Sequence, residues 1–131
     1  MPSFEQKYCM GTRDGTHQIF WDIAALTKDL QEKRLPIQQR KVSDLLEFND
    51  FSGDPAYAMG TDIEEPCIVV ELNDEIEKLI DGNHRLYKAM LLHLDTVPCY
   101  VLPFEYHSKF IIDYTFSKYK KVVKDYSKIR R

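Results

Sequence analysis

The stretch from Lys78 to Met90 runs from an apolar segment directly into Asp-Gly and then into a helix-forming pattern. Gly82 can adopt a positive φ and lets the backbone come close to a ligand. Asn83 is of a type that caps helices, so we expect it to be the N-cap of the helix that follows. Because the first turn of a helix offers free N–H groups and the positive end of its dipole, this stretch predicts an anion site, most often for phosphate.

The side chains around this turn supply the chemistry of such a site. The planar guanidinium of Arg85 can grip two phosphate oxygens, and His84 can donate to the same group and change its charge near neutral pH. Asp81 can receive a proton, bind a metal or orient its neighbours, although the Asp-Gly pair is also common in ordinary turns. Singly, each residue has a structural explanation. Together they predict catalytic roles for Asp81 and His84 and phosphate binding by Gly82, Asn83, His84 and Arg85.

The turn Asp81-Gly82-Asn83-His84-Arg85 resembles the ParB/sulfiredoxin superfamily, in which a strand, a turn containing Asp or Gly and a basic pair open a helix. The apparent element order from Asp22 to Leu102 is similar as well. The resemblance implies that a nucleotide of the ATP or CTP type is bound by its phosphates at this turn. Some members of the superfamily bind DNA or transfer phosphoryl groups.

Two departures from the family limit what it implies. Sulfiredoxins have a nucleophilic Cys before the His-Arg pair, and here that residue is Asn83, so sulfinic-acid reduction is disfavoured. ParB-type partitioning proteins have Gly-Glu-Arg-Arg at the turn and a helix-turn-helix region after it. Here His84 replaces one Arg, and about one long helix follows the last strand, so a complete DNA-segregation protein is disfavoured.

The chain of 131 residues is long enough for one domain with a core. We expect an α/β (α+β) fold of the ParB/sulfiredoxin type, with a small mixed sheet, surrounding helices, a core of about 20–104 and a C-terminal helix at 107–131. We expect a loop up to Gln18, and then a helix that is capped by Asp22 and ends near Arg34. An edge strand at 35–42 and a short helix at 44–48 capped by Ser43 should follow. The remaining expected elements are a hairpin of 67–72 and 76–80 and a strand at 97–102, which Pro98 places at an edge or a strand start.

The three cysteines and the absence of long apolar runs limit the cellular environments that we expect for the protein. No segment of the sequence has the length or pattern of a membrane span or a signal peptide, so we expect a cytoplasmic protein without a membrane partner. Cys67 and Cys99 lie in apolar strand candidates and should be buried and unpaired. A disulfide framework and a zinc site are both disfavoured.

The longest segment without a clear pattern, 49–66, contains the acidic residues Asp62, Glu64 and Glu65. These carboxylates can hold Mg²⁺ opposite a nucleotide phosphate, or they are plain surface charges, which is the more conservative interpretation. His17 is a weaker site candidate in a turn-rich loop, where a lone His is more often structural.

Charge is distributed unevenly along the chain. Residues 107–131 carry a net charge of +6, whereas the remaining residues carry −9. Apolar residues recur every three or four positions from Phe116 to Ile129. One helix face should therefore pack on the domain, or on a second copy as a homodimer. Lys118, Lys121 and Lys128 should lie on the outer face. A basic arm that binds nucleic acid is the alternative interpretation.

Three classes of function fit these observations. The favoured one is binding of a nucleotide or phosphate ester at the turn 81–85, with phosphoryl transfer or hydrolysis as its chemistry. The second is a nucleic-acid-binding protein or nuclease, and the third is a protein-interaction module without catalysis. A steep salt dependence would distinguish the second class, and retained nucleotide binding would separate the first from the third.

Overall fold

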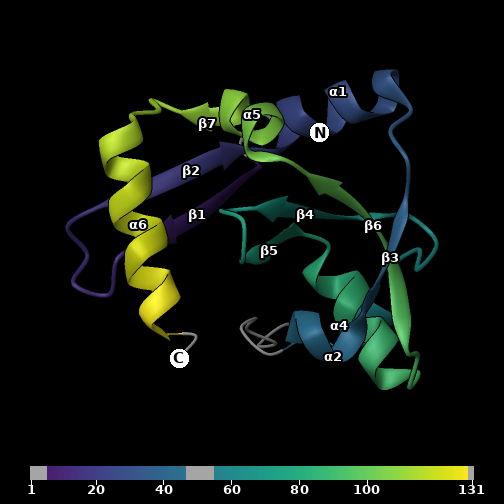
Figure 1. Ribbon diagram of the computed structural model, residues 1–131. Helices are drawn as coiled ribbons and strands as arrows, with labels where there is room; N and C mark the ends of the chain where they lie inside the picture. The colour runs from purple at the N-terminus through teal and green to yellow at the C-terminus, as the bar shows by residue number, and fades with distance from the viewer. Residues whose placement is uncertain (1–5, 47–54, 130–131) are drawn as a thin grey trace. The chain divides into compact units, whose positions relative to one another are not determined.

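The computed structural model describes residues 6–46 and 55–129 and has a mixed α/β architecture (Figure 1). Within these residues it contains two small sheets, of three and four strands, and six α-helices. The expected α/β class and small mixed sheet are confirmed by the four-stranded sheet, whereas the three-stranded sheet was not predicted. The chain forms two compact units, one of residues 1–34, 72–76 and 103–131 and the other of residues 35–71 and 77–102.

The first unit is built on an antiparallel sheet with the strand order β1-β2-β7. β1 (Lys7–Gly11) and β2 (Gln18–Asp22) form a hairpin, and β7 (Ile111–Ile112) pairs with the other side of β2. The expected loop up to Gln18 is wrong for β1. Its sequence shows little alternation because only Met10 in the strand is buried, which leaves no period-two pattern to detect.

The first helix confirms its predicted limits. α1 (Ile23–Lys33) begins after Asp22, whose side chain accepts a hydrogen bond from the Ala25 N–H at 3.0 Å. Its buried residues are Ile23, Leu26 and Leu30. Arg34 ends the helix in the left-handed conformation with a φ of 51°.

The expected continuous helix over 107–131 is wrong. The chain instead forms α5 (Phe104–His107), a 3₁₀ turn (Ser108–Phe110), β7 and only then α6 (Phe116–Ile129). Ile111 is buried as a strand residue opposite Trp21, so its apolar character reflects sheet packing. Asp113, with a φ of 52°, turns the chain before α6 begins.

α6 packs one face inward, as its periodicity predicts. Tyr119, Val122 and Val123 are buried, whereas Lys121 and Lys128 are exposed and Lys118 is half-buried. Phe116 departs from the predicted stripe because its side chain is 58% exposed. The inner face of α6 therefore begins at Tyr119.

The second unit contains a mixed sheet with the order β3-β6-β4-β5. β3 (Gln38–Lys41) is at one edge, as predicted, and β4 (Cys67–Glu71) with β5 (Glu77–Asp81) forms the predicted hairpin. β6 (Thr96–Leu102) lies between β3 and β4 and runs parallel to β4.

β6 is not an edge strand, so the predicted alternative that Pro98 places this strand at a sheet edge is wrong. Pro98 pairs with Gln39 of β3, and the pairing with β4 begins one residue later, where Cys99 lies opposite Cys67. Pro98 therefore precedes the ladder to β4, so its missing N–H leaves that ladder intact.

The helices of the second unit differ in detail from the predicted ones. α2 (Val42–Leu46) starts before Ser43, so Ser43 is not its cap, and α3 (Pro55–Met59) lies within the segment expected to be irregular. Part of the predicted short helix and of this loop falls on 47–54, outside the described residues. α4 (Asn83–Leu91) buries Leu86 and Ala89, but Leu94 lies beyond its end and is 40% exposed.

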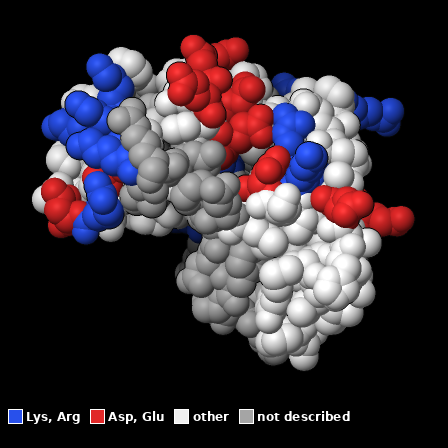
Figure 2. All heavy atoms as spheres, turned by 60° about the horizontal axis from the view of Figure 1, so that its bottom comes forward, with Lys and Arg blue, Asp and Glu red and all other residues white. Residues whose placement is uncertain are grey.

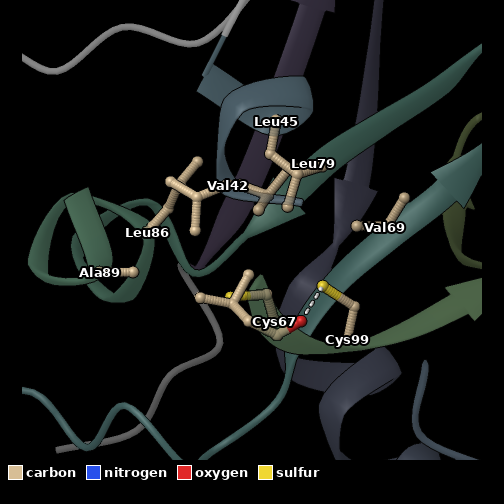
Figure 3. Packing of buried hydrophobic residues seen from close by; sticks show 9 residues of the cluster. Val42, Leu45, Cys67, Val69, Leu79, Leu86, Ala89 and Cys99 are labelled. Carbon is tan, nitrogen blue, oxygen red and sulfur yellow. Dashed lines mark hydrogen bonds between the residues drawn. The ribbon is translucent and has the colours of Figure 1, made fainter. Parts of the chain in front are cut away.

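The core of the second unit lies where α2 and α4 meet the sheet. Figure 3 shows Val42 and Leu45 of α2 close to Leu79 of β5, with Leu86 and Ala89 of α4 lining the same cluster. The cluster fixes the end of β5 and the start of α4.

The described residues contain no helix that is both long and apolar enough to cross a membrane.

Candidate functional site

The turn between β5 and α4 is where the predicted site residues meet. Asp81 is the last residue of β5, Gly82 is the N-cap of α4, and Asn83 begins the helix. The register of the hairpin shifts at Ile68 and Val69, so Asp81 lies opposite Ile68. A bulge of this kind bends a strand and redirects its side chains.

Gly82 has the predicted positive φ, with φ 107° and ψ 20°. A β-carbon at this position would lie 2.6 Å from the Sγ atom and 2.9 Å from the Cβ atom of Cys67. Both the backbone angle and the packing therefore require glycine. The close neighbour of the Gly82 backbone in this structure is Cys67.

Asn83 is not the N-cap, which corrects the prediction for that residue. Gly82 occupies the cap position and makes no side-chain hydrogen bond, while Asn83 is the first helical residue and is exposed. The first turn of α4 also contains no acidic residue. Its N–H groups therefore keep their attraction for an external anion.

Arg85 extends from the first turn of α4 to the chain just before β4. Its Nη1 donates to the carbonyl oxygen of Glu65 at 3.1 Å and also to that of Pro66, and its Nη2 donates to Oδ2 of Asp81 at 3.3 Å. The guanidinium side chain is only 16% exposed. Arg85 therefore stabilises the fold by holding the entry to β4 against the turn.

Asp81 combines an ion pair with a poorly hydrated environment. Burial raises the pKa of Asp81 above its ordinary value, although the charge and the hydrogen bond of Arg85 act in the opposite direction. Such opposing effects at one carboxyl group are typical of functional sites and also of structural ion pairs.

His84 is half-buried and lies against an aromatic ring that the sequence did not associate with the site. The ring centroids of His84 and Tyr57 are 4.6 Å apart in an edge-to-face arrangement. Tyr57 belongs to α3 and is 63% exposed. The segment 49–66 was expected to be irregular and shows no periodicity from which this contact could be predicted.

Cys67 lies against the turn in the fold, with its Sγ atom 3.8 Å from the Gly82 carbonyl oxygen. Cys67 and Cys99 are buried and unpaired, as predicted, and occupy paired positions on β4 and β6 (Figure 3). The neighbouring thiol of Cys99 lowers the pKa of Cys67, against the effect of burial. The contact with the Cys67 thiol, together with burial, raises the pKa of Cys99.

The acidic residues before β4 do not form a metal site in the described parts of the chain. Asp62, Glu64 and Glu65 are exposed, and Oδ1 of Asp62 accepts a hydrogen bond from the Glu64 N–H at 3.0 Å, as in a local turn. Within residues 6–46 and 55–129, no group of three or more His, Cys, Asp or Glu side chains has a metal-binding arrangement. Asp62, Glu64 and Glu65 are thus not gathered into such a group.

His17 lies in the β1–β2 loop of the first unit. Its Nδ1 is 2.9 Å from the Thr16 hydroxyl, and its carbonyl oxygen accepts a hydrogen bond from the Thr12 N–H at 2.9 Å. The hydroxyls of Thr12 and Thr16 donate to Asp14, and hydrogen bonds from these two residues lower the pKa of Asp14 to about 2. His17 is thus part of a self-contained loop network.

Comparisons with protein-family models, with curated proteins and with solved structures each found no match to this chain.

Proposed function

We propose that the turn 81–85 binds the phosphate group of a nucleotide or of another phosphate ester. The observation that carries this proposal is the start of α4, where a left-handed Gly82 leads into a first turn without a side-chain cap or an acidic residue. The nine residues of α4 give its N-terminus a helix dipole. His84 and Arg85 add donors beside these N–H groups.

The ion pair between Asp81 and Arg85 defines how a phosphate would enter. Nη1 of Arg85 stays on the carbonyl oxygens of Glu65 and Pro66, and the phosphate replaces Asp81 as the partner of Nη2. Burial raises the pKa of Asp81, because the poorly hydrated environment disfavours the charged form of its carboxyl group. Binding is therefore an exchange of one anion for another at Arg85.

The released Asp81 carboxylate gives the site its chemistry. In phosphoryl transfer or hydrolysis it accepts the proton of the hydroxyl or water oxygen that attacks phosphorus. The bond from phosphorus to the leaving oxygen breaks, and His84 protonates that oxygen. Positioning by the helix N-terminus and Arg85 supplies most of the rate enhancement in this scheme.

The proposal extends to the ligand and the family. We propose a nucleotide of the ATP or CTP type and a relationship to the ParB/sulfiredoxin superfamily, both supported by the sequence Asp81-Gly82-Asn83-His84-Arg85 alone. Mg²⁺ would be bound together with the nucleotide phosphates, because no group of three or more metal-binding side chains is found among the described residues.

Isothermal titration calorimetry with ATP, CTP and inorganic pyrophosphate tests the proposal. Arg85→Ala should weaken binding by about tenfold or more, since a charge-assisted hydrogen bond contributes about 1.5–3 kcal/mol. Arg40→Ala is the matched control, because Arg40 also forms an ion pair in this unit, with Glu77 at 2.9 Å. Both variants should lose stability, but Arg40→Ala should keep wild-type affinity. Unchanged affinity of folded Arg85→Ala, or an equal loss in both variants, contradicts the site.

A further inference from the structure

A cavity of about 1010 Å³ lies along α6 in the first unit. Its walls are α6, the start of α5 at Phe104 and Glu105, and the hairpin tip at 72–74, all of which belong to this unit. The volume is that of a typical ligand site. None of the residues of the turn 81–85 lines it, so it is separate from the proposed phosphate site.

Aromatic rings form the floor of this cavity. The ring centroids of Phe104 and Tyr119 are 5.0 Å apart, and the Tyr119 hydroxyl donates to the Leu72 carbonyl oxygen at 2.7 Å. Phe116 also lines the cavity and is 58% exposed. Nζ of Lys120 lies 5.4 Å from the centroid of the Phe116 ring. An exposed ring on a fixed aromatic floor is a surface on which another planar ring can stack.

Lysines form the α6 wall of the cavity. Lys120, Lys121 and Lys124 line it, and all three are exposed. Figure 2 shows Lys and Arg side chains gathered at the end of the molecule where α6 lies. The ion pairs found among the described residues involve none of these three lysines. Their charge is therefore available to an external anion.

The opposite wall carries charge of the other sign. Asp74 and Glu105 line the cavity away from α6, and both are exposed. An anionic ligand is therefore held on the lysine side. Groups that donate hydrogen bonds, such as the N–H groups of nucleic-acid bases, are compatible with the carboxylate side.

We propose that this cavity binds single-stranded nucleic acid, with phosphates along the lysine wall and a base stacked on Phe116. Basic grooves that contain aromatic rings bind single strands in this way. Lys120, Lys124 and Lys128 follow one another at helical spacing and span about 12 Å. This row is long enough to contact more than one phosphate of a strand, whereas a mononucleotide reaches only one end of it.

Duplex nucleic acid fits this arrangement less well. The bases of a duplex are stacked on one another, so none can cover Phe116 without being extruded at a cost of a few kcal/mol. A duplex therefore keeps only the phosphate contacts. Acidic peptides supply negative charge but no series of planar rings, which makes them the appropriate competitor in a test.

Fluorescence anisotropy of the full chain with a labelled oligothymidylate of about 12 nucleotides tests the proposal. Replacement of Lys120, Lys121 and Lys124 by Gln should weaken binding about tenfold or more and reduce the slope of log affinity against log salt by about 2. Phe116→Leu should weaken binding about tenfold through loss of stacking, and Phe116→Tyr should retain it.

Matched controls separate this site from general charge attraction. Replacement of Lys7, Lys28 and Lys109 by Gln removes the same charge from exposed positions outside the cavity and should leave affinity within about twofold. ATP should compete poorly, and a duplex of equal length should bind more weakly. Equal losses in both triple variants, tighter duplex binding, or displacement by an acidic peptide but not by unlabelled strand would each overturn the proposal.

Discussion

A β-carbon placed on Gly82 would lie 2.6 Å from the Sγ atom of Cys67. The strand β4 thus passes under the turn so closely that its first side chain occupies the space where a side chain of residue 82 would start. The same glycine has a φ of 107°. Strain and close packing coincide at the residue that joins β5 to α4, so the geometry of the proposed phosphate site depends on this contact.

Gly82→Ala should destabilise the protein strongly, and the two causes can be separated. Gly15 also has a positive φ, of 76°, but an added β-carbon there meets no atom within 4 Å. Gly15→Ala should lower the free energy of unfolding by about 1 kcal/mol through backbone strain. Gly82→Ala should lower it by about 1–3 kcal/mol more, because the side chain also overpacks against Cys67.

Urea denaturation of both variants measures these differences. Cys67→Ala in the Gly82→Ala background should recover part of the loss, since it removes the nearest atom. Equal destabilisation by Gly15→Ala and Gly82→Ala would show that the contact with Cys67 has no energetic weight.

Thiol labelling should distinguish the three cysteines. Cys9 is exposed, whereas Cys67 is 1% and Cys99 0% exposed. A thiol-specific reagent should therefore modify one cysteine quickly in the native protein and the other two only as fast as the protein opens. Cys9→Ser is the control and should abolish the fast phase. Rapid labelling of Cys67 in native protein would instead indicate an accessible thiol under the turn.

Local sequence patterns predicted much of the second unit. The predicted hairpin pairs β4 with β5, as the structure does, but counting outward from the turn misses the bulge that places Asp81 opposite Ile68. The same strand pairing brings Cys67 close to the turn. Because Cys67 is distant from the turn in the sequence, this contact was not predicted from the residues around the turn.

The first unit was predicted less well because its elements depend on distant partners. Phe110, Ile111 and Tyr114 recur at a helix-like spacing, yet Ile111 and Ile112 form a strand because β2 offers an unpaired edge. Short strands of this kind have too few residues for a periodic pattern. Arg85 shows the same limit at the site. Its residue type indicated an anion site, but its bonds to the carbonyl oxygens of Glu65 and Pro66 depend on tertiary structure.

The pH dependence of stability should report the environment of Asp81. Its folded-state pKa is raised by burial, so the unfolded state ionises first as pH rises. The contribution of Asp81 is fully present below its ordinary pKa of 3.8 and is lost as pH rises through the raised value. Asp81→Asn removes this dependence, so the variant should gain stability relative to wild type between acidic and neutral pH.

Urea denaturation of both proteins across this range measures the difference, with Asp95→Asn as a control at an exposed position. A wild-type protein that instead gains stability relative to Asp81→Asn as pH rises would show that the ion pair with Arg85 outweighs burial.

The hydroxyl of Tyr119 should contribute to stability, although Tyr119 is far from the hairpin tip in the sequence. It donates to the carbonyl oxygen of Leu72 at 2.7 Å, and both residues are buried. Tyr119→Phe leaves that carbonyl oxygen, at a buried residue, without this donor, so the free energy of unfolding should fall by about 1–3 kcal/mol. Tyr114→Phe is the control, because Tyr114 is 37% exposed and its hydroxyl can be hydrated. Thermal denaturation of both variants checks the difference. A loss no greater for Tyr119→Phe than for Tyr114→Phe would mean that the hydrogen bond does not hold the hairpin tip to α6.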